Sequence, residues 1–270
     1  MTTLAEVLAV LEDWYPPHTA DEWDRVGLVC GDPSESVERI LLAVDPVQAV
    51  AAEAVAEQAD LLIVHHPLYL RGTSSVAATD PKGRVVHQLL RAGCALYAAH
   101  TNADAPRSGV SESLAFALGL DSVAPLEPDP QDQHRGSGRI GDLGESMPLQ
   151  AFAERVRDAL PPTAHGVRVA GDPERSIRRV ALCGGAGDFL LDRAREVGAD
   201  VYLTSDLRHH PSSEFREHDG PALVDVAHWA AEWTWLPVLA QRLRAALADK
   251  GANVEVRVSE IATDPWTFRV

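Results

Sequence analysis

The stretch RILLAVDP at residues 39–46, followed by ADLLIVHH at residues 59–66, determines the fold that we predict. Residues 40–44 and 61–64 are continuous apolar segments of strand length, and residues 47–58 between them have helical periodicity. A further helix and a third apolar strand follow. Continuous apolar strands that alternate with helices are typical of a parallel sheet covered on both faces. This part of the chain therefore predicts an α/β lobe.

The second half of the chain repeats this pattern. RVALCGGA at residues 179–186 and ADVYLTSD at residues 199–206 align without gaps on the two segments above. ALYAAHTNAD at residues 95–104 aligns with LVDVAHWAAE at residues 223–232 after a small gap. Identity is low, so two generic β-α-β units in register are the alternative, but the agreement in lengths and polar positions favours an internal duplication. The matched polar pairs are Arg39 with Arg179, Asp60 with Asp200, His100 with His228 and Asp104 with Glu232.

A polar segment separates the two halves. Residues 125–138 (PLEPDPQDQHRGSG) are rich in Pro, Asp and Gly and have no apolar period, so we expect a linker or long loop there. This boundary predicts a first lobe at residues 1–125 and a second at residues 126–270, with the option that the last strand, at residues 254–258, returns to the first lobe. The predicted fold class is α/β, with two linked, related lobes, mostly parallel central sheets and a metal site in the cleft between the lobes.

Composition limits the class of protein. With 270 residues, 46% of them hydrophobic, the chain can bury a sizeable core, and it has no run of eighteen apolar residues that would predict a membrane span. The N-terminus is acidic and carries the capping box Thr3-x-x-Glu6, which predicts a folded helix and no signal peptide. Three widely spaced cysteines form neither a disulfide framework nor a zinc-ligand pattern, so we expect a reduced, cytoplasmic protein. The net charge of −16 disfavours a nucleic-acid partner, and an anionic substrate would need a local positive centre such as a metal pair.

Two neighbouring histidines end the second apolar strand. His65 and His66 precede Pro67, which favours an extended backbone at His66. Adjacent residues on a regular strand face opposite sides, but where the chain bends at a strand end two imidazoles can point into one crevice. The carboxyl end of parallel strands is also where open α/β sheets bind ligands. The alternative for an isolated pair is a loop in which each ring bonds to the backbone.

Two further polar pairs follow later strands. His100 and Asp104 come after the third strand, and Pro106 keeps this segment from forming a long helix; alone, it is also typical of a turn. His228 and Glu232 are four residues apart at the start of a helix, so both face the same way. Taken alone, such a pair is more often a surface ion pair than a metal site.

The combination of these pairs predicts a two-metal site. Imidazole and carboxylate donors in similar numbers suit zinc, manganese, iron, cobalt or nickel. Five or six donors exceed the needs of one tetrahedral zinc ion and suit two ions bridged by a carboxylate. We therefore expect two divalent metal ions per chain, with their identity open among these metals. The predicted ligands are His65, His66, Asp104, His228 and Glu232.

A third polar cluster, TSDLRHH at residues 204–210, corresponds in the second half to the histidine pair. Asp206 aligns with His66 and could bind metal, orient a ligand histidine or contact substrate. Arg208, His209 and His210 could pair with a phosphate or carboxylate, or form a solvated loop. The predicted catalytic residues are His100 and Asp206, and the predicted substrate contacts are Thr101, Asn102, Arg208 and His210.

These motifs resemble those of a known family, the NIF-three-like dinuclear metal proteins, many of which are called GTP cyclohydrolase 1 type 2 homologues. The resemblance runs nearly end to end and is carried by ADEWDRVGLVCGDP, LLIVHHPL, AAHTNAD, GSGRIGDL, CGGAGDFL, GADVYLTSDLRHH and DVAHWAAE. It implies two divalent metals bound by the five predicted ligands, with His100 close by, two linked α/β lobes and a ring-shaped homohexamer. Arg25, Ser205 and His209 stand where the family pattern has asparagine, glycine and tyrosine, so the departures concern substrate contacts more than metal ligands.

The first functional hypothesis is a metal-dependent hydrolase that acts on a small molecule, either a nucleotide or a phosphoester. Two ions would lower the pKa of a bridging water and polarise the reacting centre, while His100 or Asp206 would move protons. The resemblance implies a GTP cyclohydrolase-like activity, although the sequence contains no guanine-specific motif. The alternative is a non-catalytic, metal-binding or partner-binding ring-shaped scaffold. A DNA-binding role comes third because the charge opposes it.

Overall fold

The computed structural model of the protein describes residues 2–270, which form two compact units. The first unit contains residues 2–103 and Leu236–Thr263, and the second contains Asp104–Trp235 and Asp264–Val270. The chain therefore leaves the first unit and later comes back to it. The sequence predicted a boundary between the lobes at residue 125. In the structure, residues 110–128 already pack with the second sheet.

The first unit is built on a mostly parallel sheet. Its strands, in spatial order, are β13 (Glu255–Val258), β4 (Arg39–Ala43), β5 (Leu61–Val64), β6 (Ala95–Ala98) and β2 (Gly27–Cys30). β13, β4, β5 and β6 are parallel, whereas β2 pairs antiparallel with β6 at the edge. Every residue of β5 and β6 is buried, as a sheet covered on both faces requires. The C-terminal strand β13 thus belongs to the first sheet.

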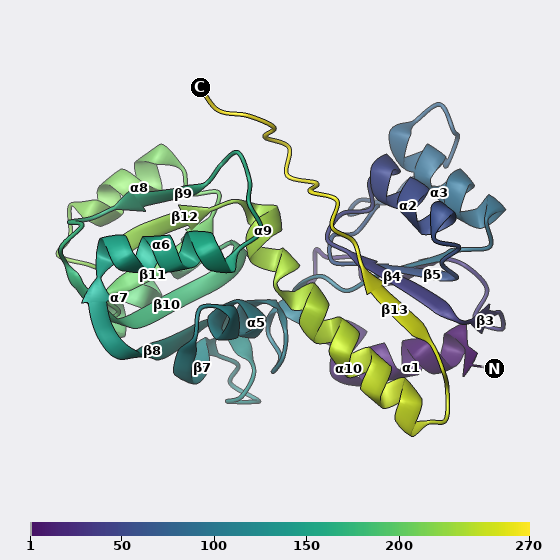
Figure 1. Cartoon of the computed structure of the whole chain (residues 1–270), viewed down its shortest axis with the longest axis horizontal. Helices are drawn as coiled ribbons and strands as arrows, with labels where there is room; N and C mark the ends of the chain where they lie inside the picture. Colours follow the sequence, from purple (N-terminus) through teal and green to yellow (C-terminus); the bar gives the residue numbers. More distant parts are fainter. Residues whose placement is uncertain (1) are drawn as a thin grey trace. The chain divides into compact units, whose positions relative to one another are not determined.

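Helices cover both faces of this sheet, and they are α1 (Leu4–Trp14), α2 (Gln48–Ala56), α3 (Pro81–Arg91) and α10 (Trp235–Asp249). Figure 1 shows α2 and α3 on one face and α1 and α10 on the other. The predicted capping box begins α1, because the Thr3 hydroxyl accepts from the Glu6 N–H at 3.3 Å and the Glu6 carboxylate accepts from the Thr3 N–H at 2.9 Å. Shorter elements complete the unit: β1 (Thr2–Thr3), β3 (Ser36–Val37) and the 3-10 turn η1 (Pro17–Thr19).

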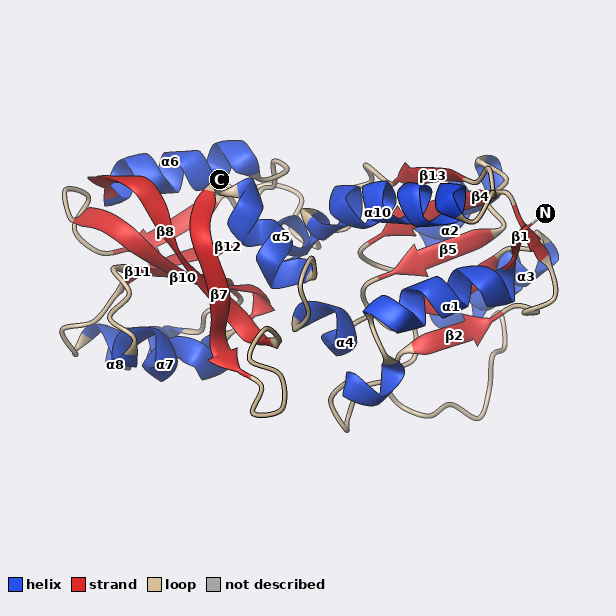
Figure 2. Ribbon diagram, turned by 90° about the horizontal axis from the view of Figure 1, so that it is seen from below, coloured by secondary structure: helices blue, strands red, loops and turns tan. Residues whose placement is uncertain are grey.

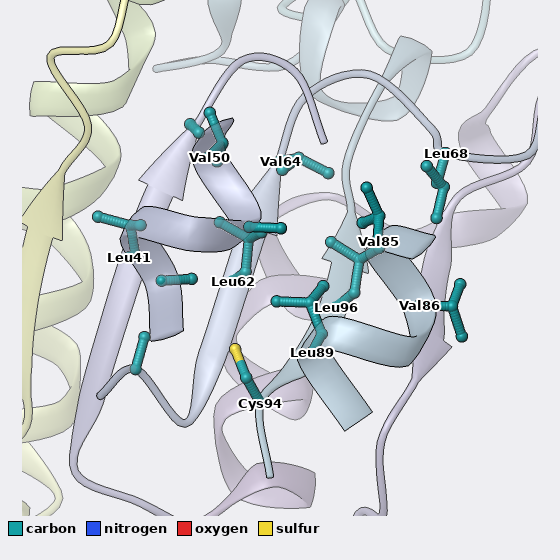
Figure 3. Close-up of a cluster of buried hydrophobic side chains, with 14 of the residues drawn as sticks. Leu41, Val50, Leu62, Val64, Leu68, Val85, Val86, Leu89, Cys94 and Leu96 are labelled. Atoms are coloured by element: carbon teal, nitrogen blue, oxygen red, sulfur yellow. The ribbon is translucent and has the colours of Figure 1, made fainter. Parts of the chain in front are cut away.

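Figure 3 shows the apolar core between this sheet and the α2–α3 layer. Leu41, Leu62 and Leu96 project from β4, β5 and β6 toward the side that carries Val50 of α2 and Leu89 of α3. Each of these five side chains is at most 2% exposed, and burial of one such side chain contributes about 1.5–3 kcal/mol. The core holds the parallel strands in register, so the residues that follow β5 and β6 emerge at the same edge.

The second unit is built on a sheet whose centre is parallel. Its strands, in spatial order, are β7 (Leu120–Pro128), β8 (Gly136–Pro148), β10 (Ser176–Ala186), β11 (Val201–Ser205), β12 (Ala222–Val226) and β9 (Val167–Ala170). β10, β11 and β12 are parallel, and β7, β8 and β9 are antiparallel to their neighbours. The prediction of two α/β lobes with mostly parallel central sheets is therefore confirmed.

The helices of the second unit also lie on both sides of its sheet. Figure 2 shows α6 (Leu149–Ala159) on one side, with α7 (Leu191–Glu196) and α8 (His209–Arg216) on the other. α5 (Val110–Ala117) packs on β7, β8 and β10, and α9 (His228–Trp233) packs on β10 and β11. The 3-10 turn η2 (Asp188–Leu190) precedes α7. Within residues 2–270, each helix is too short or too polar to cross a bilayer.

Residues 125–138 form the tip of a β-hairpin, with a connection of only residues 129–135, so the predicted linker or long loop is wrong. β7 and β8 pair antiparallel from Leu120 opposite Leu143 to Pro128 opposite Gly136. The prediction failed because β7 is an edge strand that mixes exposed and buried positions and has no apolar run. Of the residues that suggested a linker, Asp129, Pro130 and Asp132 lie in the connection at residues 129–135, whereas the other prolines and the glycines lie within the two strands.

The predicted duplication has a counterpart in the hydrogen bonds at the amino ends of the central strands. The Oδ2 atom of Asp60 accepts from the N–H groups of Glu38 and Arg39, both at 2.8 Å. The Oδ2 atom of Asp200 accepts in the same way from the N–H groups of Arg179 and of the residue before it, at 2.8 and 2.9 Å. These matched contacts support the gap-free alignment of the two halves.

Candidate metal centre

Three histidines gather at the carboxyl edge of the first sheet. His66 directly follows His65 at the end of β5, and its N–H donates to the carbonyl of Val44 at 2.9 Å, which holds the chain against the end of β4. The two rings lie 5.0 Å apart, centre to centre. The ring of His100, just after β6, lies 5.1 Å from that of His65 and 5.5 Å from that of His66. One potential ligand atom from each residue lies within 4.8 Å of the others.

Each of these three rings is held through its Nδ1 atom by an oxygen. Carbonyl and carboxylate oxygens only accept hydrogen bonds, so a neutral ring must carry its proton on Nδ1. The lone pair is then on Nε2, and this is the tautomer that a histidine uses when it binds a metal through Nε2. The contacts are His65 with the carbonyl of Ala99 at 2.9 Å, His66 with Asp45 at 2.7 Å and His100 with Asp24 at 2.8 Å.

Asp24 connects His100 to the segment that follows it. The Oδ2 atom of Asp24 accepts from the N–H and the hydroxyl of Thr101, at 3.0 and 2.6 Å. Burial raises the pKa of Asp24, but the hydrogen bonds from His100 and Thr101 outweigh this effect and hold its pKa well below the usual range. Asp24 is therefore a buried carboxylate at neutral pH, and it fixes the orientation of the His100 ring.

The second unit contributes further donors, which lie at the carboxyl edge of its own sheet. His228 is the first residue of α9, and its Nε2 atom lies 2.8 Å from Oε1 of Glu232, one turn further along. Its Nδ1 atom lies 2.6 Å from Oδ2 of Asp206, in the segment after β11. Hydrogen bonding from His228 lowers the pKa of Asp206. One imidazole thus lies between two carboxylates, an arrangement that calls for a positive charge, either a proton or a metal ion.

Gly185 leaves space for this set. Its φ of +70° is in the left-handed region that favours glycine. A Cβ atom at this position would lie 2.5 Å from Oε1 of Glu232 and 3.2 Å from Nε2 of His228. The glycine-rich end of β10 therefore accommodates the two predicted ligands, which gives this motif a role besides close strand–helix packing.

Asp104 ends the short helix α4 (Thr101–Asp104) and belongs to the second unit, where its charge acts on Cys183 and Arg139. Burial raises the pKa of Cys183 to about 12, and the Asp104 carboxylate adds to this increase. Burial likewise raises the pKa of Cys94 to about 12. Both cysteines are neutral thiols at physiological pH, and among residues 2–270 neither belongs to a candidate metal-binding group.

The chemistry of the donor sets fits divalent metals of the borderline class. The first unit offers three imidazoles with the same tautomer, and the second offers one imidazole and buried carboxylate oxygen. Such nitrogen and oxygen donors suit zinc, manganese, iron, cobalt and nickel, whereas a site selective for soft ions would use thiolates. The structure thus supports candidate metal-binding groups in both units.

The predicted substrate contacts lie in different surroundings. Asn102 is fully buried, donates to the carbonyl of Tyr15 at 2.7 Å and accepts from the His100 N–H at 2.9 Å. Arg208 is 74% exposed and pairs with Asp188 at 2.6 Å. His210 is exposed in the first turn of α8. Thr101 binds Asp24, as described above, so Thr101 and Asn102 both hold the backbone next to the histidine cluster.

Sequence reasoning missed the residues that orient the rings. Asp45 follows β4 and Asp24 precedes β2, and neither was proposed as part of the site. Asp45 could have been found, because it is a carboxylate at the carboxyl end of a parallel strand, the same position that identified His65 and His66. Asp24 offered no such signal, since β2 is the antiparallel edge strand and its approach to His100 depends on tertiary structure.

The two sheets with parallel centres and the histidine–carboxylate sets define an α/β protein with candidate metal-binding groups. The sequence profile of the Duf34/NIF3 (NGG1p interacting factor 3) family matches residues 2–265. The chain belongs to this family, as its motifs predicted.

Relatives match the chain over nearly its whole length. A Streptomyces coelicolor protein named GTP cyclohydrolase 1 type 2 homolog is 50% identical over 272 residues, which cover 100% of this chain and 95% of that protein. A Mycobacterium tuberculosis protein of the same name is 36% identical over 371 residues, which cover 98% of this chain and 97% of that protein. The second alignment is longer than this chain, so that relative carries a segment without a counterpart here.

Solved structures share the fold. A crystal structure of a Staphylococcus aureus protein has a TM-score of 0.92 and 27% identity and covers 99% of both chains. A Bacillus cereus protein related to NIF3 also has a TM-score of 0.92, with 24% identity and coverage of 99% of both chains. The second similarity concerns the fold alone.

Proposed function

We propose that this protein is a metal-dependent hydrolase that uses two divalent metal ions on a nucleotide or phosphoester-like small molecule. The observation that carries this proposal is the shared tautomer of His65, His66 and His100, whose Nδ1 atoms all face oxygen acceptors. Such anchoring is typical of metal ligands and is not needed by histidines that only fill a loop. The ligands in this proposal are His65, His66, Asp104, His228 and Glu232.

When bound, two divalent ions supply Lewis acidity at the reacting centre and a water whose pKa is lowered toward neutrality. The surrounding residues would orient the ligands and move protons. Asp206 is the candidate proton acceptor, because its carboxylate lies beside the predicted ligand His228 and its side chain is 60% exposed. His100 is the second candidate, and its side chain is 16% exposed and oriented by Asp24.

The substrate class in this proposal follows from charge and from the relatives. A chain of net charge −16 repels anions over most of its surface, and a metal pair would supply the positive centre that an anionic substrate needs. The Streptomyces coelicolor relative carries the name GTP cyclohydrolase 1 type 2 homolog. GTP is therefore the first substrate to test, followed by nucleoside and aryl phosphate esters.

The test combines metal analysis with turnover. Purified protein is reconstituted with each candidate metal, its metal content is measured by elemental analysis, and hydrolysis of GTP and of a phosphoester panel is followed. We expect about two ions per chain and a metal-dependent activity that His65→Ala abolishes. His87→Ala is the matched control, because His87 lies on α3, away from the carboxyl edge of the sheet. Activity unchanged by His65→Ala, or metal content near zero after reconstitution, would refute the proposal.

A second candidate function is a non-catalytic metal-binding or partner-binding scaffold, which we propose to assemble as a homohexameric ring. The engagement of Thr101 and Asn102 within the protein favours it, because these predicted substrate contacts already have internal partners. Two bound ions without turnover across the panel, together with a hexameric mass by light scattering, would support the scaffold. A monomeric mass would contradict the ring.

A further inference from the structure

The second unit contains a pocket of about 390 Å³ whose lining includes none of the predicted metal ligands. It lies between α8 and the strands β9 and β12, and β9 is the last strand at that edge of the sheet. Ala170, Leu207 and Leu223 give it an apolar floor. Arg168, Arg208 and Arg216 stand around it, and we call it the arginine pocket.

The charge of the arginine pocket is opposite to that of the chain. Acidic residues outnumber Lys and Arg by 40 to 24 in the whole protein, yet three arginines and a single carboxylate, Asp225, line this pocket. Clustered guanidinium groups repel one another, which costs stability unless a ligand or a fixed anion compensates. A cationic pocket on an acidic protein therefore indicates an anionic ligand.

The one carboxylate in the pocket is already occupied. Oδ2 of Asp225 accepts from Nε2 of His165 at 2.9 Å and from Nε of Arg168 at 2.8 Å, and Oδ1 accepts from the Leu207 N–H at 2.9 Å. Asp225 is only 5% exposed, and through these hydrogen bonds it fixes Arg168 and the segment after β11. Its charge offsets that of Arg168 and leaves the other two arginines uncompensated from within the pocket.

Those two arginines have weaker partners. Arg216 donates to the carbonyl oxygen of Pro221 at 3.2 Å, which is an uncharged acceptor. Arg208 pairs with Asp188, but its side chain is 74% exposed, and exposed ion pairs are weak enough for a better-placed anion to replace. Both guanidinium groups can therefore turn toward a ligand at small cost. Guanidinium groups bind phosphate and carboxylate oxygens with two parallel hydrogen bonds, and the charge of two arginines matches the nearly double negative charge of a phosphate monoester.

The start of α8 adds further donors to the same pocket. α8 begins at His209, its N-cap residue Arg208 gives it no side-chain cap, and its first turn carries no acidic residue. The amide groups and the positive end of the helix dipole at this point favour an anion. Ser212 and Ser213 also line the pocket, and the Ser212 hydroxyl donates to the Arg208 carbonyl at 2.8 Å, so its oxygen can still accept.

We infer that the arginine pocket binds a small organic phosphate, of the size of a nucleoside monophosphate, with its phosphate on the arginines and its organic body on the apolar floor. A volume of about 390 Å³ lies within the range of small-ligand pockets, roughly 300–1,000 Å³, and is too small for a polymer. The apolar floor distinguishes a phosphate ester from free phosphate. None of the predicted metal ligands lines the pocket, so the inference does not depend on the proposed hydrolase activity.

The test is a binding measurement on the full chain after chelation of metals. Calorimetric titrations use AMP and GMP, ribose 5-phosphate, inorganic phosphate and the uncharged nucleoside guanosine. We expect the nucleoside monophosphates to bind more tightly than inorganic phosphate, and guanosine to bind at least tenfold more weakly than GMP. Arg216→Gln should weaken GMP binding at least tenfold, about 1.4 kcal/mol, and Arg208→Gln should weaken it in the same direction.

Arg178→Gln is the matched control, because it removes the same charge from an exposed position of the same unit that does not line the pocket. It should leave GMP binding within twofold, and thermal melting should establish that all three variants are folded. The inference is overturned if no phosphate binds at millimolar concentration, if guanosine binds as tightly as GMP, or if the control weakens binding as much as Arg216→Gln. It is also overturned if Arg216→Gln changes only self-association, since the open edge at β9 would then be an interface between copies of the chain.

Discussion

Replacing Arg139 with methionine should destabilise the second unit strongly. Arg139 is fully buried in β8, and its guanidinium group donates to carbonyl oxygens on two segments. It reaches Gly136 and Gly138 at 2.9 and 2.8 Å, and Ala105 and Pro106 at 2.9 and 2.7 Å. One arginine therefore ties the hairpin of β7 and β8 to the segment that directly follows Asp104.

The expected loss of stability follows from these contacts. Burial lowers the pKa of Arg139, with Glu112 acting in the opposite direction, and an arginine remains charged even so. Its Nε lies 3.5 Å from Oε1 of Glu112, whose side chain is 12% exposed. Arg139→Met would remove the guanidinium group from four carbonyl oxygens and from Glu112. The carbonyls of Ala105 and Pro106 would keep one backbone donor each, and Glu112 would keep the Ser108 N–H, but the buried positive charge that compensates Glu112 would be lost. Removing one partner of a buried charge pair costs about 3–5 kcal/mol, and methionine recovers only part of the apolar packing.

Urea unfolding followed by circular dichroism measures this loss. For Arg139→Met we expect the free energy of unfolding of the second unit to fall by about 3–5 kcal/mol. The free energy of unfolding of Arg139→Lys should lie between those of the unchanged protein and Arg139→Met, because an ammonium group keeps the charge but cannot reach all four carbonyls. Arg157→Met is the control, since Arg157 is 63% exposed and its ion pair with Asp158 lies at the surface. A loss below about 1 kcal/mol for Arg139→Met would show that the buried network is not stabilising and would refute this reasoning.

Three other outcomes are expected. Asp45→Asn should weaken metal binding about 10–100-fold, as measured by titration with a chelator competitor, because it removes the carboxylate that orients His66. Gly185→Ala should lower the metal content of the protein, because the added Cβ atom would enter the space of Glu232 and His228. Gly198→Ala is its control, because Gly198 has a similar φ (+69°) but no atom within 4 Å of the added Cβ, so it should show only the backbone strain. Equal metal content in the two variants would contradict the proposed space requirement. The pKa of Cys183 is about 12 in the folded protein, against 9.0 for an ordinary thiol. Because the thiol ionises more easily in the unfolded chain, the stability of the fold is at its full value below pH 9 and decreases as the pH rises from 9 toward 12. The free energy of unfolding should therefore fall by up to about 1.4 kcal/mol between pH 9 and 10, and a variant with alanine at this position should lack that part of the slope.

The sequence was most informative where strands are buried on both faces. β4, β5 and β6 are continuous apolar segments, and the same pattern around residue 200 revealed the second parallel core. The strand ends then located the histidine cluster, because chain order alone places the residues after parallel strands at one edge. The assignment of individual ligands stays a prediction.

The features that the sequence did not reveal depend on one-sided or long-range contacts. The β7–β8 hairpin was missed because the polar residues of its exposed face resemble those of a loop. The burial of Arg139 could not be predicted, because arginine side chains usually lie at the surface. Asp24 and His100 are 76 residues apart, so nothing in the local pattern pairs them. The arginine pocket is likewise assembled from β9, β12 and α8, which a linear reading does not bring together.

The return of the chain to the first unit has a consequence for the order of folding during synthesis. The strand neighbours of β4 are β5 and β13, and β13 is made only after all six strands of the second sheet. Until then one edge of β4, with buried residues Ile40 to Ala43, presents unpaired backbone groups that can pair with another nascent chain. The second sheet, encoded by the continuous run Asp104–Trp235, can close first. The sheet that starts the protein is therefore the one that is completed last, and its open strand edge is the part most exposed to aggregation while translation continues.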